Sequence, residues 1–97
     1  MVRVAESDLH RHLRERMVQR GVSKDEIEKV LNDGWEAQDA KSGTQGKTMV
    51  FVIATEAAET PHSEQEVTVY YKHIDRQLIL LPVKARYGQH FPRAEES

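Results

Sequence analysis

The segment Gly21-Val-Ser-Lys-Asp-Glu26 constrains the fold of this chain more than any other stretch. Ser23 and Glu26 have the spacing of a capping box, in which the backbone amide of each residue donates a hydrogen bond to the side chain of the other. Gly21 is the residue type that commonly ends a helix in the left-handed conformation. One helix therefore ends and another begins within a few residues, which predicts a pair of helices joined as an αα-hairpin.

The limits of the two helices follow from their end signals. Ser7 is a favourable N-cap and Asp8 places a carboxylate in the first turn, so the first helix is expected to run from there to about Arg20. The second helix is expected to run from the capping box to the segment that ends at Gly34. Its apolar face is formed by residues spaced i, i+3 and i+4, namely Ile27, Val30 and Leu31.

From Trp35 onward strand patterns replace the helical period. The runs expected to form strands are 48–54, 67–71 and 77–83. The segment 84–88 either continues the last of these strands or closes it. The first run is apolar throughout, so both of its faces are expected to be covered. Pro82 lacks an amide donor and marks an edge strand or a bulge. The weak alternation of 35–41 leaves open a short edge strand or an irregular segment. The polar segments expected as turns or loops are 42–46, 55–64 and 73–76.

Two helices followed by consecutive strands predict an α+β domain. Successive strands with short connections pair as antiparallel neighbours, and the helices must then cover one face of the sheet. We expect two N-terminal helices packed on one face of a three- to four-stranded antiparallel sheet. The chain of 97 residues is expected to form a single domain, with an ordered core at about 7–90 and a polar tail at 91–97.

The charge of the chain is slightly acidic and unevenly distributed. The net charge is −2, which argues against non-specific binding to nucleic acid through bulk charge. Residues 1–22 nevertheless carry five arginines against three carboxylates, and residues 71–97 carry five Lys and Arg against three carboxylates. Residues 35–70 hold two lysines against six carboxylates. If the two basic ends meet in space, an acidic protein can present a local positive site.

Several classes of site are disfavoured by the residue types. The chain has no cysteine, which excludes disulfides and thiolate chemistry and is typical of a cytoplasmic protein. No apolar run approaches about 18 residues, so no membrane association is expected. His10 and His12 diverge by about 200° on a helix and cannot share a metal ion. No zinc, calcium or nucleotide motif is present, so we expect no metal and no cofactor.

A helix–turn–helix DNA reader is the next alternative, because the segment from Arg20 to Leu31 resembles that motif locally. The helix that would enter the major groove carries four carboxylates against two lysines. Phosphate would repel such a helix, which disfavours this interpretation.

The first helix carries a row of cations beside its apolar stripe of Leu9, Leu13 and Met17. On a helical wheel Arg20 falls within that stripe, Arg16 lies about 20° outside it and His12 about 60° outside it. Either Arg20 lays its stem along apolar neighbours and turns its head to water, or the row borders a cationic cleft where helix meets sheet.

The residue types in and around this row suffice for metal-independent RNA cleavage. That reaction needs a base for the 2′-hydroxyl proton, cations on the phosphate and an acid for the leaving oxygen. The expected catalytic residues are His12, Arg16, Arg20 and Arg86, and the expected substrate-binding residues are Lys47, Tyr87 and His90. Each also has an ordinary structural interpretation, as a turn lysine, a strand-end charge, a half-buried aromatic or a tail residue.

The same row carries a resemblance to a known family. The pattern resembles the N-terminal signature of an uncharacterised family of small bacterial domains, and it reads His12-x-x-x-Arg16-Met17-x-x-Arg20-Gly21-Val22-Ser23-x-x-Glu26, ending in Leu31-x-x-Gly34. The similarity covers roughly residues 8–90, including the compatible segment Arg86-Tyr87-Gly88. That family is related to the RelE-like and barnase-like ribonuclease toxins. The resemblance implies two helices against an antiparallel sheet and an RNA-cleaving site at His12, Arg16 and Arg20, with Arg86 as a weaker candidate.

Two functions therefore stand as expectations. The first is a metal-independent RelE-like endoribonuclease or toxin-like RNA-binding domain, with RNA as substrate and an antitoxin as partner. The second is a non-catalytic protein-interaction module on the same fold, which would bind another protein through a strand edge or the tail.

Overall fold

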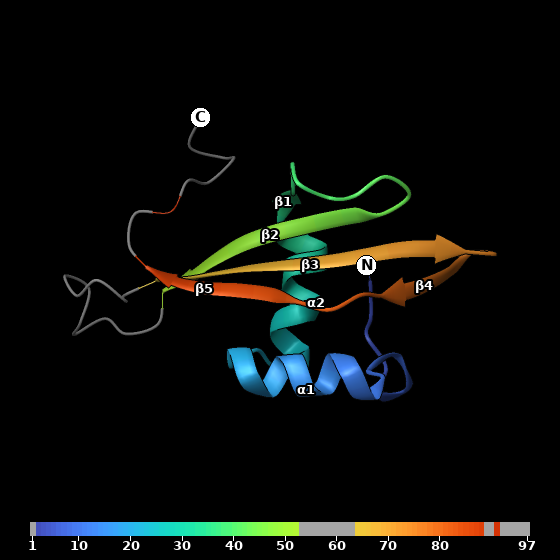
Figure 1. Cartoon of the computed structure of the whole chain (residues 1–97), viewed down its shortest axis with the longest axis horizontal. Coiled ribbons are helices and arrows are strands. Elements are labelled where there is room, and N and C mark those ends of the chain that lie inside the picture. The colour runs from blue at the N-terminus through green and yellow to red at the C-terminus, as the bar shows by residue number, and fades with distance from the viewer. Residues whose placement is uncertain (1, 53–63, 89–90, 92–97) are drawn as a thin grey trace.

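The structure is a computed structural model that describes residues 2–52, 64–88 and 91. A short 3-10 turn, η1 (Glu6–Asp8), precedes the two helices, α1 (Arg11–Arg20) and α2 (Lys24–Asp33). The strands that follow are β1 (Trp35–Glu36), β2 (Gln45–Val52), β3 (Glu64–Ile74), β4 (Gln77–Leu80) and β5 (Lys84–Gly88). The predicted α+β class, with the helices N-terminal to an antiparallel sheet, is confirmed (Figure 1).

The sheet is built around the long strand β3. Strand β2 pairs with one side of β3 and carries β1 on its other side. The first half of β3 pairs with β5 and the second half pairs with β4, so β4 and β5 lie end to end along one edge. Pro82 lies in the break between them, as its missing amide donor predicts. All pairings are antiparallel.

The two helices occupy different places relative to the sheet. Figure 1 shows α2 crossing behind the sheet and α1 running beside the edge that β5 forms. We call the sheet face that packs on the helices the inner face and the opposite one the outer face. Residues directly opposite in antiparallel strands share a face, so the register places Lys84 with Thr68, and Arg86 with Glu66, on the outer face.

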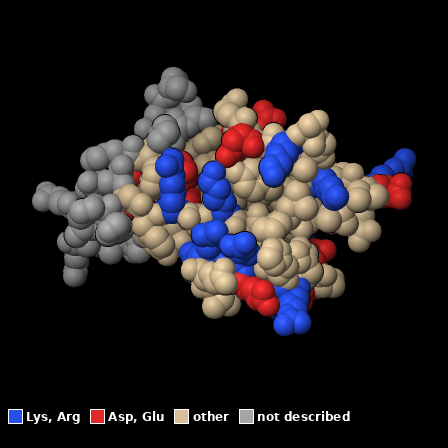
Figure 2. Space-filling model, in the orientation of Figure 1, with Lys and Arg blue, Asp and Glu red and all other residues tan. Residues whose placement is uncertain are grey.

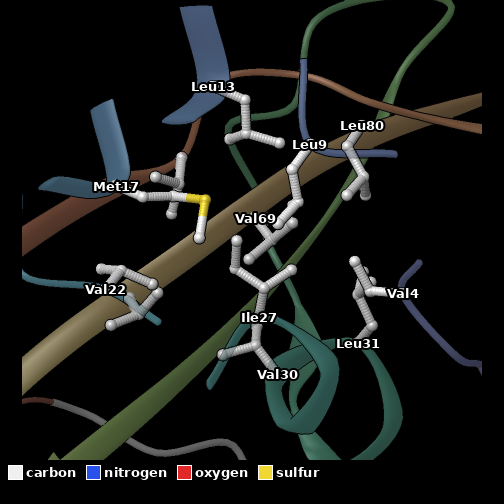
Figure 3. Packing of buried hydrophobic residues seen from close by; sticks show 12 residues of the cluster. Val4, Leu9, Leu13, Met17, Val22, Ile27, Val30, Leu31, Val69 and Leu80 are labelled. Carbon is white, nitrogen blue, oxygen red and sulfur yellow. The ribbon is translucent and has the colours of Figure 1, made fainter. Parts of the chain in front are cut away.

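A single apolar cluster joins the helices to the inner face. Val69 of β3 lies between Leu13 and Met17 of α1 on one side and Ile27 and Val30 of α2 on the other (Figure 3). Leu13, Ile27 and Val30 have no exposed surface. The N-terminal segment also contributes, because Val4 and Leu9 belong to the same cluster. The segment before residue 7 therefore packs against the core through Val4.

The predicted start of the first helix is wrong. Helix α1 begins at Arg11, and its N-cap is His10, whose ring nitrogen Nδ1 accepts a hydrogen bond from the Leu13 amide at 3.3 Å. The Asp8 carboxylate instead accepts from the backbone amide of Ala5 at 2.9 Å. This contact closes η1 as a separate turn. Ser7 and Asp8 therefore belong to η1 and do not cap α1.

The other end signals are confirmed. The Ser23 amide donates to Glu26 Oε1 at 2.8 Å, and the Glu26 amide donates to Ser23 Oγ at 3.2 Å, which closes the capping box. Gly21 ends α1 with φ of 66°. A left-handed residue costs an L side chain about 1–2 kcal/mol, and glycine avoids that cost.

Strand lengths differ from the sequence-based limits. β3 begins at Glu64, which was expected in a loop, and runs on to Ile74. The turn was expected at 73–76, but β3 includes His73 and Ile74. The turn itself consists of Asp75 and Arg76, with φ of 50° and 67°. Two positive φ values match the twist of a two-residue hairpin turn of type I′. Trp35 and Glu36 form a short edge strand, one of the two alternatives left open for 35–41. Residues 53–63, which include the expected end of the first strand and most of the expected loop at 55–64, lie outside the described residues.

Gly34 marks the closest approach of α2 to the sheet. A Cβ at this position would lie 2.5 Å from the Val30 carbonyl oxygen and 2.6 Å from the Thr48 carbonyl oxygen. Both neighbours are backbone atoms, which a rotamer change cannot move. The absence of a side chain at Gly34 therefore lets the end of α2 rest directly on β2.

We expect Gly34→Ala to lower the free energy of unfolding by about 2–3 kcal/mol, the upper part of the usual range for overpacking, because the atoms that the Cβ would meet belong to the backbone. The measurement is urea unfolding followed by circular dichroism. Gly43→Ala is the matched control, because a Cβ there meets nothing within 4 Å and adds only the strain of its positive φ of 84°. Equal losses in the two variants would contradict this account of Gly34.

Candidate functional site

Helix α1 is fastened to the edge of the sheet at both of its ends. Near its start the His10 ring nitrogen Nε2 lies 3.0 Å from the Leu80 carbonyl oxygen. Near its end the Arg20 carbonyl oxygen accepts hydrogen bonds from Gln65 Nε2 at 2.9 Å and from the Tyr87 hydroxyl at 3.4 Å. Because Nδ1 of His10 accepts the capping bond, Nε2 carries the proton. Helix α1 therefore runs along the broken edge strand from β4 to the end of β5.

These contacts at the two ends of α1 determine which side of the helix faces α2. Arg14 and Gly21 line a surface hollow together with Ser23 and Glu26 of the α2 start. On a helical wheel His12 and Arg16 lie on the flank opposite Arg14, so they are turned away from α2. Figure 2 shows Lys and Arg side chains gathered over β5 and the adjoining part of α1. We call the set His12, Arg16, Arg20, Lys84 and Arg86 the basic stripe.

The α1 members of the basic stripe lack carboxylate partners. Arg16 and Arg20 are half-buried, and neither forms an ion pair with any residue that the structure describes. The Nε atom of Arg20 is buried and has no hydrogen-bond partner among the described residues. A buried donor left unpaired costs about 1–3 kcal/mol. Arg16 and Arg20 are therefore the guanidiniums of the basic stripe that no ion pair within the described residues neutralises.

The β5 members of the basic stripe are paired within the protein. The Arg86 Nε donates to Glu66 Oε1 at 2.7 Å, and this hydrogen bond raises the pKa of the guanidinium further above its ordinary value. The Arg86 guanidinium also lies 4.7 Å from the centre of the Phe91 ring, a cation–π contact. Lys84 Nζ donates to Asp39 Oδ2 at 3.0 Å. Arg86 therefore has a structural role that fixes the C-terminal end of β5.

The remaining sequence-based candidates fall in different places. The Tyr87 side chain is half-exposed and lies next to the end of α1, where its hydroxyl contacts the Arg20 carbonyl. Lys47 pairs with Val69, so its side chain is on the inner face and does not join the basic stripe. His90 lies outside the described residues. His12 is exposed and eight residues from Arg20, which is about 12 Å along the helix.

The structure therefore brings Arg20 and Tyr87 together at the end of α1, whereas the Arg86 side chain lies on the outer face beside Glu66. It does not gather the predicted catalytic set around one point, because His12 lies about two helical turns from Arg20. A linear array of this kind suits a long polyanion better than a single small anion.

One polar cluster on the outer face was missed from the sequence. The Tyr70 hydroxyl donates to both carboxylate oxygens of Asp39 at 3.0 Å, and Lys84 completes the group. The hydrogen bond from Lys84 lowers the pKa of Asp39, and the same bond raises the pKa of Lys84. Burial, followed by the bond to Asp39, raises the pKa of Tyr70. The three residues are far apart in the sequence. Tyr70 and Lys84 share a face because Lys84 pairs with Thr68, which lies two residues before Tyr70 on β3, and this pairing is not visible in the sequence.

Comparison with known proteins adds no assignment. The chain matches no protein-family model, no curated protein and no solved structure. Among the residues described by the structure, no three His, Cys, Asp or Glu side chains are grouped so that they could hold a metal ion. None of the described helices combines the length and apolarity needed to cross a membrane.

We expect Asp39→Asn to remove a small, pH-dependent part of the stability. The folded-state pKa of Asp39 is lowered from 3.8, so its contribution is complete above that value and is lost as the pH falls through the lower folded value. Because the carboxylate is exposed, we expect less than about 1 kcal/mol at pH 7.

The measurement is thermal unfolding of the wild type and of Asp39→Asn between pH 7 and pH 2. The difference between their melting temperatures should narrow below about pH 4. Asp33→Asn is a suitable control because Asp33 forms a comparable exposed ion pair, with Lys29, away from the outer face. A difference that widens on acidification would contradict the assignment.

Proposed function

We propose that this chain is a RelE-like RNA-binding domain, which holds the phosphate backbone of single-stranded RNA along the basic stripe. The observation that carries the proposal is the state of Arg16 and Arg20. Both side chains are only half-buried, and neither forms an ion pair with a carboxylate of the residues that the structure describes. Arginine forks match the geometry of phosphate oxygens. The resemblance of the α1 pattern to a family related to ribonuclease toxins supports the same function.

The length of the row favours a polymeric ligand. Residues spaced four apart on a helix are about 6 Å apart along its axis, so His12, Arg16 and Arg20 span about 12 Å. A stacked nucleic-acid strand places one phosphate per about 3.4 Å of axis. The row can therefore follow several phosphates of one strand. The half-exposed Tyr87 ring beside Arg20 offers a surface on which a base can stack.

RNA cleavage without a metal is the finer form of this proposal. His12 is the one imidazole in the basic stripe, and histidine exchanges protons near neutral pH. In this scheme His12 takes or returns the proton at the scissile linkage, while Arg16 holds the phosphate charge. A cytoplasmic toxin of this kind would be held inactive by an antitoxin protein.

A protein-interaction module is the second candidate, because α1 also carries an exposed apolar residue. The Val18 side chain is 83% exposed and borders the hollow between the helices, beside Met17 and Val22. An exposed apolar residue beside a hollow is a common feature of protein-docking surfaces. This surface lies on the flank of α1 opposite the basic stripe, so the two functions can be tested separately.

We expect Arg16→Gln to weaken binding of a fluorescein-labelled single-stranded RNA by roughly three- to tenfold in anisotropy titrations. The slope of log affinity against log salt should also fall by about 0.7, the value for one lost phosphate contact on a single strand. Arg11→Gln is the matched control, since it makes the same change in net charge at a 93% exposed side chain on the same helix. Equal losses of RNA affinity in both variants would show that binding depends on net charge and not on the position of Arg16.

Cleavage predicts a different pattern for His12. We expect His12→Ala to abolish degradation of a 5′-labelled RNA by the purified protein, and growth arrest on induction in bacteria, while RNA binding falls by no more than about threefold. His73→Ala, at an exposed histidine on the distant β3 hairpin, should leave cleavage unchanged. Binding without degradation in the wild type would leave an RNA-binding domain and refute the nuclease.

A further inference from the structure

A hollow of about 370 Å³ opens on the outer face of the sheet. It lies between the loop that connects β1 to β2 and the break between β4 and β5. Its lining residues are Asp39, Lys41, Thr44, Tyr70, Leu81 and Pro82. This volume is within the range of about 300–1,000 Å³ that is typical of small-molecule sites.

The walls of the hollow are held in place by hydrogen bonds. The Tyr70 hydroxyl is fixed by Asp39, and the Tyr70 carbonyl oxygen accepts from the Leu81 amide at 2.9 Å. On the loop side the Thr44 amide and hydroxyl both donate to the Lys41 carbonyl, at 2.9 and 2.6 Å. A hollow with walls fastened on both sides needs little reordering to receive a ligand, which lowers the entropy cost of binding.

The lining combines flat apolar surface with a few charged groups. Tyr70, Leu81 and Pro82 provide the apolar part, and the Asp39 carboxylate and the exposed Lys41 supply the charges. A nucleobase has the same character, with apolar faces and a polar edge of donors and acceptors. Aromatic and apolar side chains commonly hold unstacked bases in this way.

Lys84 joins this hollow to the basic stripe. Its Nζ bonds to Asp39 at the wall of the hollow, while its backbone lies on β5 two residues before Arg86. The register puts Lys84 on the outer face, and Asp39 lies there too because it is bonded to Tyr70 and Lys84. Figure 2 shows Lys and Arg side chains gathered on this face. A strand whose phosphates follow the basic stripe thus passes the mouth of the hollow.

From this arrangement we infer that the hollow is a base-binding subsite, which takes one unstacked base of single-stranded RNA and prefers cytosine to uracil. The inference rests on the proposed RNA binding and deepens it. Asp39 accepts hydrogen bonds only, and its carboxylate has lone pairs beyond those used by Tyr70 and Lys84. The amino group of cytosine can donate to this carboxylate, whereas the carbonyl oxygen of uracil at the same position is repelled by it.

The experiment compares oligocytidine and oligouridine of equal length in anisotropy titrations. We expect the wild type to bind oligocytidine about 5–20-fold more tightly, as one charge-assisted hydrogen bond allows. Asp39→Asn should bring the ratio close to one, because an amide both donates and accepts. Asp33→Asn is the control that removes the same charge far from the hollow and should keep the preference.

A second measurement locates the base directly. Titration of cytidine 5′-monophosphate into ¹⁵N-labelled protein should shift the amide signals of Tyr70, Leu81 and Thr44, and should leave Val18 and Val22 unchanged. Thr44→Phe, which fills the hollow, should abolish those shifts while the amide spectrum of the helices shows a folded protein.

The outcomes separate this inference from the proposed function. Equal binding of both oligonucleotides, with a loss in Arg16→Gln, would overturn the base subsite and keep RNA binding. Amide shifts confined to residues outside the hollow, on titration of cytidine 5′-monophosphate, would also overturn the base subsite and keep RNA binding. No binding of either oligonucleotide would overturn both.

Discussion

The fastening of α1 along the edge of the sheet is the interaction on which the rest of this structure depends. The helix buries only Leu13 and Met17, so its apolar surface alone does not fix its rotation strongly. The bond between His10 and the Leu80 carbonyl, and the bonds from Gln65 and Tyr87 to the Arg20 carbonyl, set that rotation. Because both ends are fixed, the cationic flank of α1 borders β5 and its apolar flank meets α2.

The pairing of charges on the outer face explains how a protein with a net charge of −2 presents a positive surface. Lys84 and Arg86 are bound to Asp39 and Glu66, so they contribute structure more than free charge. Arg16 and Arg20 of α1 form no such ion pair with any residue that the structure describes. Local potential therefore depends on which cations the fold leaves unpaired, and bulk charge says little about it. The same pairing joins the β1–β2 loop to β5 and so shapes the outer hollow.

The parts of the fold that could be predicted from the sequence are those governed by local chemistry. The capping box at Ser23 and the left-handed Gly21 depend on contacts within a few residues, and both have the expected geometry. The predicted start of α1 failed because two local options competed. The Asp8 carboxylate bonds the Ala5 amide, and His10 takes the capping role since its ring also reaches the Leu80 carbonyl, a contact 70 residues away.

The sequence by itself determined the α+β class, the helical hairpin, the edge position of Pro82 and the row of cations on the first helix. Only the tertiary structure decided which of the candidate side chains meet. A shift of one residue in register moves a strand side chain to the opposite face, so the separation of Lys47 from Arg86 depended on pairing that no local pattern encodes. The grouping of Asp39, Tyr70 and Lys84 was likewise decided by strand pairing and loop placement, because contacts across 31 and 45 residues form only when the sheet closes.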